Sequence, residues 1–133
     1  MSMTSLNNLY ETTIRAIYKA IAFNVALFPK FVESGTTTKL TKEKVVKDFD
    51  KLTFKTQIIL KPVLDYAKTY YDCKTIEGMP LENKSDAETQ WEKAVAANDI
   101  MGSAGYTNPA LSNLTMSFME GTGWFKPDYD KLE

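Results

Sequence analysis

Arg15 and Lys19 are two charged side chains whose type and spacing could do chemistry together. They lie four residues apart in a stretch with helical periodicity, and residues four apart on a helix face the same way. The pair could therefore hold an anion such as a carboxylate. The simpler interpretation is that both side chains are solvated, or that Arg15 pairs with Glu11 one turn earlier, which stabilises a helix by roughly 0.2–0.5 kcal/mol.

The composition removes the side chains that most enzymes rely on. The chain has 133 residues, no histidine and one cysteine, Cys73. Histidine is the commonest metal ligand and the commonest general base, and a catalytic thiolate usually needs a histidine beside it. An internal disulfide is impossible with one cysteine, so we expect Cys73 to be a free buried thiol, with a bridge to another chain as the alternative.

Charge and hydropathy patterning exclude several classes of protein. Sixteen basic and seventeen acidic residues nearly cancel, and no basic stripe indicates nucleic-acid binding. No apolar run is long enough to span a membrane. The first residues lack the pattern of a signal peptide and the last lack that of a lipid anchor, which favours an intracellular protein. The length suits one domain, 1–133.

A long amphipathic helix is predicted from Ser5 to about Phe28. Ser5 or Thr4 can cap its start, and Pro29 marks its end, because the residue before a proline avoids the helical region. Apolar residues recur along it at spacings of three and four, which places them on one stripe. This stripe consists of Leu6, Leu9, Tyr10, Ile14, Ile17, Tyr18, Ile21 and Val25.

The middle of the chain predicts a small strand and a short helix. Period-two alternation indicates a strand near Thr53–Leu60, whereas the preceding Val45–Asp50 is ambiguous. Pro62 then opens a helix over Val63–Tyr71. Residues 33–43 and 74–89 are polar and irregular, which is typical of loops.

A final helix is predicted from Pro109. Asn108 would cap it, and Gly121 or Gly123 would stop it. The chain as a whole therefore predicts a mainly α fold with a small β element, in the α+β class.

Three segments match one known family in order and spacing: Cys73–Asn83, Gln90–Met101 and Leu111–Tyr129. They resemble the leishmanolysin family of zinc endopeptidases. That family shows a cysteine, a Leu-Glu-Gly-x-x-Leu-Glu loop and His-Trp-Glu-Lys-Arg, followed by a Met-turn and by a helix ending in Asp-Ser-Gly-Trp-Tyr. The similarity extends upstream to the opening helix and so covers most of the chain.

The resemblance assigns roles to positions on the opening helix. The family carries H-E-x-x-H-x-x-G there, and two histidines four apart can grip one zinc ion. In this sequence Arg15 stands at the first histidine, Ala16 at the general-base glutamate, Lys19 at the second histidine and Ala22 at the glycine.

The resemblance also implies that the family's zinc chemistry is lost here. Gln90 stands at the third histidine position, and Met101 keeps the Met-turn position eleven residues later. Zinc needs neutral imidazoles with one open position, and the reaction needs a carboxylate base. Arg15 and Lys19 are cations without a free lone pair, and Ala16 has no proton acceptor. We therefore expect no catalytic residue, no metal site and no cofactor.

The implied architecture is a truncated zincin-like scaffold, with the former active-site helix followed by a C-terminal subdomain. The family's N-terminal sheet subdomain has no counterpart within 1–133, so we expect the apolar face of the first helix to be exposed and covered by a protein partner. No small-molecule substrate is expected.

The hypothesis from sequence is a pseudopeptidase that acts as a structural or interaction subunit. The alternatives are a piece of a zinc metalloendopeptidase, a family associated with proteolysis and cell adhesion, and a decoy regulator of an active paralogue.

Overall fold

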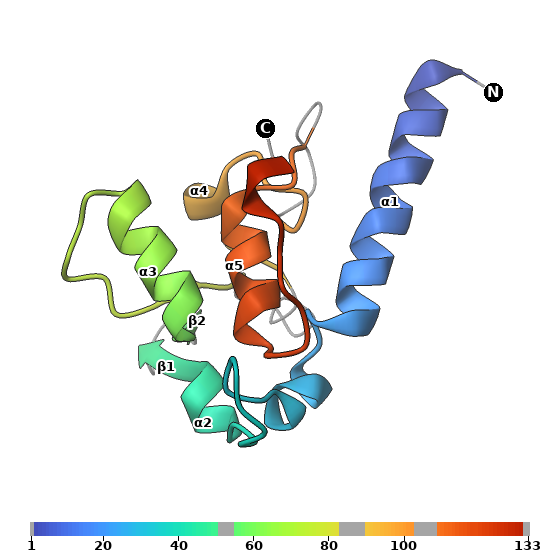
Figure 1. The fold of residues 1–133 in the computed structure, drawn as a ribbon. Helices are drawn as coiled ribbons and strands as arrows, with labels where there is room; N and C mark the ends of the chain where they lie inside the picture. Colours follow the sequence, from blue (N-terminus) through green and yellow to red (C-terminus); the bar gives the residue numbers. More distant parts are fainter. Residues whose placement is uncertain (1, 51–54, 83–89, 103–108, 132–133) are drawn as a thin grey trace.

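The computed structural model describes residues 2–50, 55–82, 90–102 and 109–131. Helices dominate it, and a small antiparallel sheet lies beside α2 and α3 (Figure 1), which confirms the predicted fold class. The elements in chain order are α1 (Met3–Ile21), η1 (Val25–Lys30), α2 (Lys42–Val45), β1 (Val46–Asp50), β2 (Lys55–Ile58), α3 (Lys61–Tyr70), β3 (Met79–Pro80), α4 (Lys93–Ala96), α5 (Asn113–Gly121) and η3 (Tyr129–Lys131).

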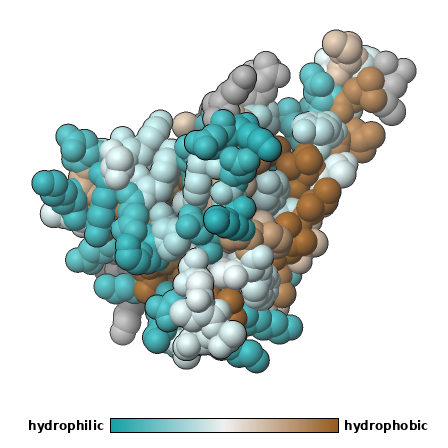
Figure 2. Space-filling view, in the orientation of Figure 1, coloured by the Kyte–Doolittle hydropathy of each residue, from teal (hydrophilic) through white to brown (hydrophobic). Residues whose placement is uncertain are grey.

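Helix α1 extends away from the body of the molecule at its N-terminal end (Figure 1). Its cap is Ser2, whose side chain accepts a hydrogen bond from the amide of Ser5 at 3.2 Å, so the predicted caps Thr4 and Ser5 are one turn too late. None of its residues is fully buried. Hydrophobic side chains therefore lie along its surface (Figure 2).

Helix α1 ends at Ile21, so the prediction that it continues to Phe28 was wrong. The amides of Ala22 and Phe23 both donate to the Tyr18 carbonyl at 2.9 Å, and a 3-10 helix, η1, follows. Phe23 and Phe28 are each 1% exposed. Five helical residues turn through about 500°, which would place these rings about 140° apart, so the break lets both enter one core.

The three-stranded sheet has the order β1-β2-β3 and is antiparallel throughout. The ambiguous segment is strand β1, in which Val46 pairs with Ile58 of β2. Ile58 also pairs with Met79 of β3. Strand β2 lies within the predicted strand, although Thr53 and Phe54 fall outside the described residues. Val46, Ile58 and Met79 are buried, so this side of the sheet faces the core.

Helix α3 begins at Lys61 with Pro62 in its first turn, as the sequence predicts. It packs against α5, which begins at Asn113 and not at Pro109. The chain ahead of α5 is instead held to another loop, because the amide of Ala110 donates to the Asn98 carbonyl at 2.8 Å. Ser112 is the observed cap, and the predicted cap Asn108 lies outside the described residues.

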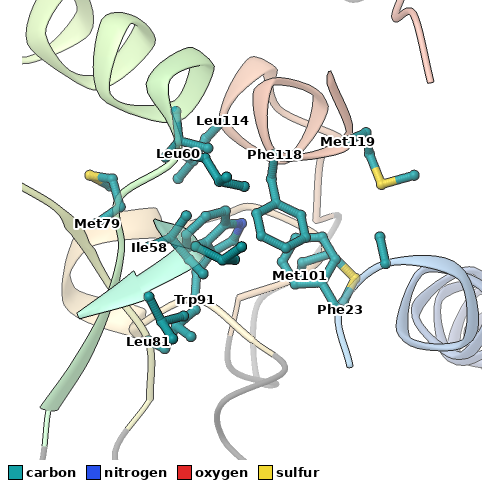
Figure 3. Packing of buried hydrophobic residues seen from close by; sticks show 14 of the residues in the cluster. Phe23, Ile58, Leu60, Met79, Leu81, Trp91, Met101, Leu114, Phe118 and Met119 are labelled. Carbon is teal, nitrogen blue, oxygen red and sulfur yellow. The ribbon is translucent and has the colours of Figure 1, made fainter. Parts of the chain in front are cut away.

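Aromatic rings from distant segments form the centre of the core. Phe118 of α5 lies at this centre (Figure 3), with its ring centroid 4.3 Å from that of Phe23 and 5.8 Å from those of Phe31 and Trp91. Phe28 adds a further contact at 6.1 Å. All five side chains are at most 1% exposed. This cluster fixes the end of α1 against α5 and against the segment that carries Trp91.

Gly123 follows the end of α5, and its backbone is in the left-handed region, with φ at +75°. A Cβ added there would lie 2.2 Å from the Val32 carbonyl oxygen, whereas Gly35, at φ +78°, has nothing within 4 Å of its added Cβ. We predict that Gly123→Ala lowers the free energy of unfolding by about 3 kcal/mol and Gly35→Ala by about 1 kcal/mol, because both alanines are strained and only one clashes. Urea unfolding followed by tryptophan fluorescence measures both. Equal losses would contradict the clash.

Candidate functional site

The face of α1 assigned to zinc by resemblance carries Arg15, Ala16 and Lys19. Arg15 and Lys19 are half-buried, and Ala16 is exposed. The Arg15 Nε is buried and has no hydrogen-bond partner in the described part of the chain. Among those residues no ion pair joins Arg15 to Glu11, so the pairing considered from the sequence is not formed.

The structure places Gln90 and Met101 at one junction of the core. Gln90 is half-buried, and its carbonyl accepts from the Glu82 amide at 3.2 Å. The next residue, Trp91, donates its amide to the Met101 carbonyl at 2.9 Å, and its ring lies 5.6 Å from that of Phe23 just beyond α1. Met101 is 1% exposed and lies in a turn. The segment that carries Gln90 and Trp91 and the Met101 turn therefore lie together, with Trp91 against Phe23 just beyond the end of α1.

A buried carboxylate, Asp99, organises this junction and was not singled out from the sequence. Its Oδ1 accepts from the Met101 amide at 2.6 Å and from the Thr115 hydroxyl at 2.7 Å. Its Oδ2 accepts from the Ser112 amide at 3.2 Å and from the Ser112 hydroxyl. Thr115 Oγ1 in turn accepts from the Trp91 indole at 3.0 Å. The signal in the sequence that could have identified this residue is that Asp99 is a single acidic residue within a mostly apolar stretch.

These four hydrogen bonds occupy the acceptor positions that a carboxylate offers. Asp99 therefore joins the Met101 turn to the start of α5 and has no acceptor position left for a ligand. Burial raises the pKa of Asp99 above its usual value, and the hydrogen bonds from Ser112 and Thr115 counteract part of that shift. Burial also raises the pKa of the Tyr18 phenol on α1, to which the negative charge of Asp99 adds.

A shallow groove separates the second half of α1 from α5. Its volume is about 450 Å³. The Tyr18 hydroxyl donates to the Met116 sulfur across it at 4.0 Å. The groove is mostly apolar and is lined by Ile14, Ile17, Tyr18, Ile21, Met116, Met119, Phe125, Lys126, Pro127 and Asp128.

The described residues contain neither a cluster of metal-ligand side chains nor a membrane-spanning helix. Within 2–50, 55–82, 90–102 and 109–131, no three histidine, cysteine, aspartate or glutamate side chains gather in a way that could hold a metal ion. In the same ranges, no helix is long and apolar enough to cross a membrane. Cys73 is a free thiol and is half-exposed, with its sulfur 3.3 Å from the Thr75 hydroxyl, so the prediction that it is buried was wrong.

The comparison with protein families decides the relationship. A family described as Leishmanolysin matches residues 5–133, almost the whole chain. The chain belongs to the leishmanolysin family. The resemblance inferred from the sequence is thereby confirmed, and the family is one of metallopeptidases.

Curated leishmanolysin relatives are much longer than this chain. A "Leishmanolysin-like peptidase" of Caenorhabditis elegans is 29% identical over 157 residues, which cover 94% of this chain and 24% of the relative. One from Drosophila pseudoobscura pseudoobscura is 33% identical over 70 residues, covering 50% of this chain and 10% of the relative. No solved structure matches the chain. The chain thus spans about a quarter of the length of its C. elegans relative.

Proposed function

We propose that this chain is a non-catalytic member of the leishmanolysin family that acts as a structural or interaction subunit. The observation that carries the proposal is the set of side chains at the positions that the family uses for zinc and for its general base. These positions hold Arg15, Ala16, Lys19 and Gln90.

The chemistry of these side chains does not fit zinc. A guanidinium offers no lone pair and an ammonium repels a dication. At 4 Å two unit charges interact by about 4 kcal/mol at an effective dielectric near 20, so the repulsion between Lys19 and a dication is about 8 kcal/mol. The half-buried Arg15, whose Nε has no hydrogen-bond partner among the described residues, adds a second cation on the same face. Gln90 offers one weak neutral oxygen.

The interaction role is supported by the surface of α1. Five large apolar side chains of this helix are between 48% and 79% exposed, and the described body covers only one edge of it. A helix with an uncovered apolar face in a folded protein marks a binding surface. The retained core around Phe118 would keep that surface in a fixed orientation.

Zinc content and hydrolysis together test the catalytic part of the proposal. We expect less than about 0.1 zinc per chain by elemental analysis after incubation with a small excess of zinc and desalting. We also expect no cleavage of a quenched fluorescent peptide library, with or without chelator. Stoichiometric zinc with chelator-sensitive cleavage would overturn the proposal and establish a metallopeptidase that uses other ligands.

A matched variant makes this test sharper. Arg15→His, Ala16→Glu, Lys19→His and Gln90→His, introduced together, restore the donor set of the family. We expect this quadruple variant to retain more zinc than the parent chain, while Arg15→His alone retains no more than the parent, because one imidazole cannot hold the ion. Equal retention by the parent and the quadruple variant would show that these positions do not form the site.

A further inference from the structure

A cavity of about 380 Å³ lies where the C-terminal end of α3, the loop after α4 and the start of α5 meet (Figure 1). Three of the residues that line it are tyrosines from the end of α3: Tyr66, Tyr70 and Tyr71. The loop after α4 contributes the carboxylate of Asp99. None of the positions that the family uses for zinc lines this cavity, so it is separate from them.

The three tyrosine rings are held in two orientations. The Tyr66 and Tyr70 rings are nearly parallel, at 22° with centroids 5.5 Å apart. The Tyr71 ring is nearly perpendicular to that of Tyr70, at 85° and 4.9 Å. Its hydroxyl donates to the Val95 carbonyl at 2.7 Å, which fixes this ring between α3 and α4. Two perpendicular rings form a corner in which one small group can lie against both faces, and Tyr70 is exposed to solvent.

Asp99 brings to this cavity a negative charge that forms no ion pair within the described part of the chain. It is 3% exposed, and the four hydrogen bonds that it accepts favour its charged form. Burial raises the pKa of the Tyr66 phenol, and the neighbouring tyrosines and the charge of Asp99 add to that shift. The field of the carboxylate therefore reaches the tyrosine rings, and a cation beside them would lower the cost of the buried charge.

The hydrogen bonds that are already made decide which cation fits. All acceptor positions of Asp99 are occupied. The carbonyl of Val95 accepts from Tyr71, and that of Asn98 accepts from the Ala110 amide at 2.8 Å. A metal ion or a primary ammonium needs oxygens that are free to coordinate it or to accept its hydrogen bonds. A quaternary ammonium has no N–H donor, and aromatic faces and negative charge are enough to bind it.

We propose that this cavity binds a quaternary ammonium group against Tyr70 and Tyr71, within the field of Asp99. This binding role goes beyond the interaction role proposed above and does not depend on it. Contacts between a cation and an aromatic face are individually modest. With two ring faces and one buried charge, we expect a dissociation constant on the order of 1 mM for tetramethylammonium.

Titration with tetramethylammonium chloride, followed by two-dimensional NMR at constant ionic strength, tests the proposal. We expect saturable changes in the amide signals around Tyr70 and Val95. tert-Butanol has a similar shape without the charge, and ammonium carries the charge without the methyl groups, so both should bind at least tenfold more weakly. Absence of saturation up to about 50 mM tetramethylammonium, or equal affinity for either control compound, would overturn the proposal.

Substitutions at an exposed tyrosine test the contribution of the ring. Tyr70→Leu removes one ring face and should weaken tetramethylammonium binding at least fivefold, whereas Tyr70→Phe keeps the face and should change it less than twofold. Tyr10→Leu is the matched control, because Tyr10 on α1 is 67% exposed and Tyr70 is 66% exposed. Circular dichroism melts verify that the three variants are folded. Equal effects of Tyr70→Leu and either of the other two would refute the assignment.

Quaternary ammonium groups occur on free cations such as choline and on phosphatidylcholine headgroups, and two measurements distinguish these sources. Competition by choline, with the chain left in the supernatant when phosphatidylcholine vesicles are sedimented, assigns a free cation. Co-sedimentation with the vesicles that Tyr70→Leu abolishes assigns the headgroup. Binding of neither would overturn the proposal. Zinc binding or peptide cleavage would instead overturn the catalytic inactivity and leave this site unaffected.

Discussion

Phe118→Ala is expected to lower the free energy of unfolding by about 4 kcal/mol, because it removes a fully buried ring and leaves a cavity in the centre of the core. Four aromatic rings have their centroids within 6.1 Å of the Phe118 ring and would all lose contacts: Phe23, Phe28, Phe31 and Trp91. Three of these contacts, with Phe28, Phe31 and Trp91, are edge-to-face, a geometry that adds to the energy of burial alone. Urea unfolding followed by circular dichroism measures the loss.

Phe125→Ala is the matched control for this substitution. It removes the same ring from a position that is 40% exposed, so we expect a loss below about 1.5 kcal/mol. Similar losses for the two variants would show that Phe118 is not the centre of the core.

Asp99→Asn is expected to cost about 3 kcal/mol at pH 7. The amide group presents an N–H₂ where the carboxylate accepts hydrogen bonds, so either the Met101 amide or the Ser112 amide loses its acceptor in a buried site. The Thr115 hydroxyl, whose oxygen accepts a hydrogen bond from the Trp91 indole, would lose its own acceptor if the amide took the other orientation. Asp48→Asn, at an exposed carboxylate, is the control for the change in charge.

The effect of Asp99→Asn should also depend on pH, with a definite sign. Burial raises the pKa of Asp99 in the folded state above its unfolded value of about 3.9. The folded state therefore holds the proton more tightly, and this contribution to stability is complete below the unfolded pKa and is lost as the pH rises through the folded pKa. Relative to Asp99→Asn, the parent chain should gain stability as the pH is lowered from 7 to 3.5. A difference that shrinks towards low pH would contradict the direction of the shift.

Local patterns in the sequence were enough to predict several elements and to identify the family. The period-two alternation that ends at Leu60 predicted β2, and Pro62 predicted the start of α3, because these depend on one face of a strand and on the fixed φ of proline. The apolar stripe along α1 could also be recognised from the sequence. The ordered segments from Cys73 to Tyr129 identified the leishmanolysin family, and the family comparison confirmed it.

Only the tertiary structure decided where the helices begin and end. Periodicity continued α1 to Phe28, yet the burial of Phe23 and Phe28 in one core broke the helix after Ile21. Pro109 favoured an early start for α5, yet the bridge between Ala110 and the loop at Asn98 held that segment extended until Ser112. In both cases contacts between distant segments outweigh local preferences of a few tenths of a kcal/mol per residue.

At the candidate site, too, the sequence determines some features and the tertiary structure determines others. The types at Arg15, Ala16, Lys19 and Gln90 are written in the sequence, and from them alone follows the absence of imidazole and carboxylate donors at those positions. That Asp99 is buried and joined to Ser112 and Thr115 follows only from the fold, because a lone carboxylate in a sequence has no neighbours until distant segments meet and exclude water around it.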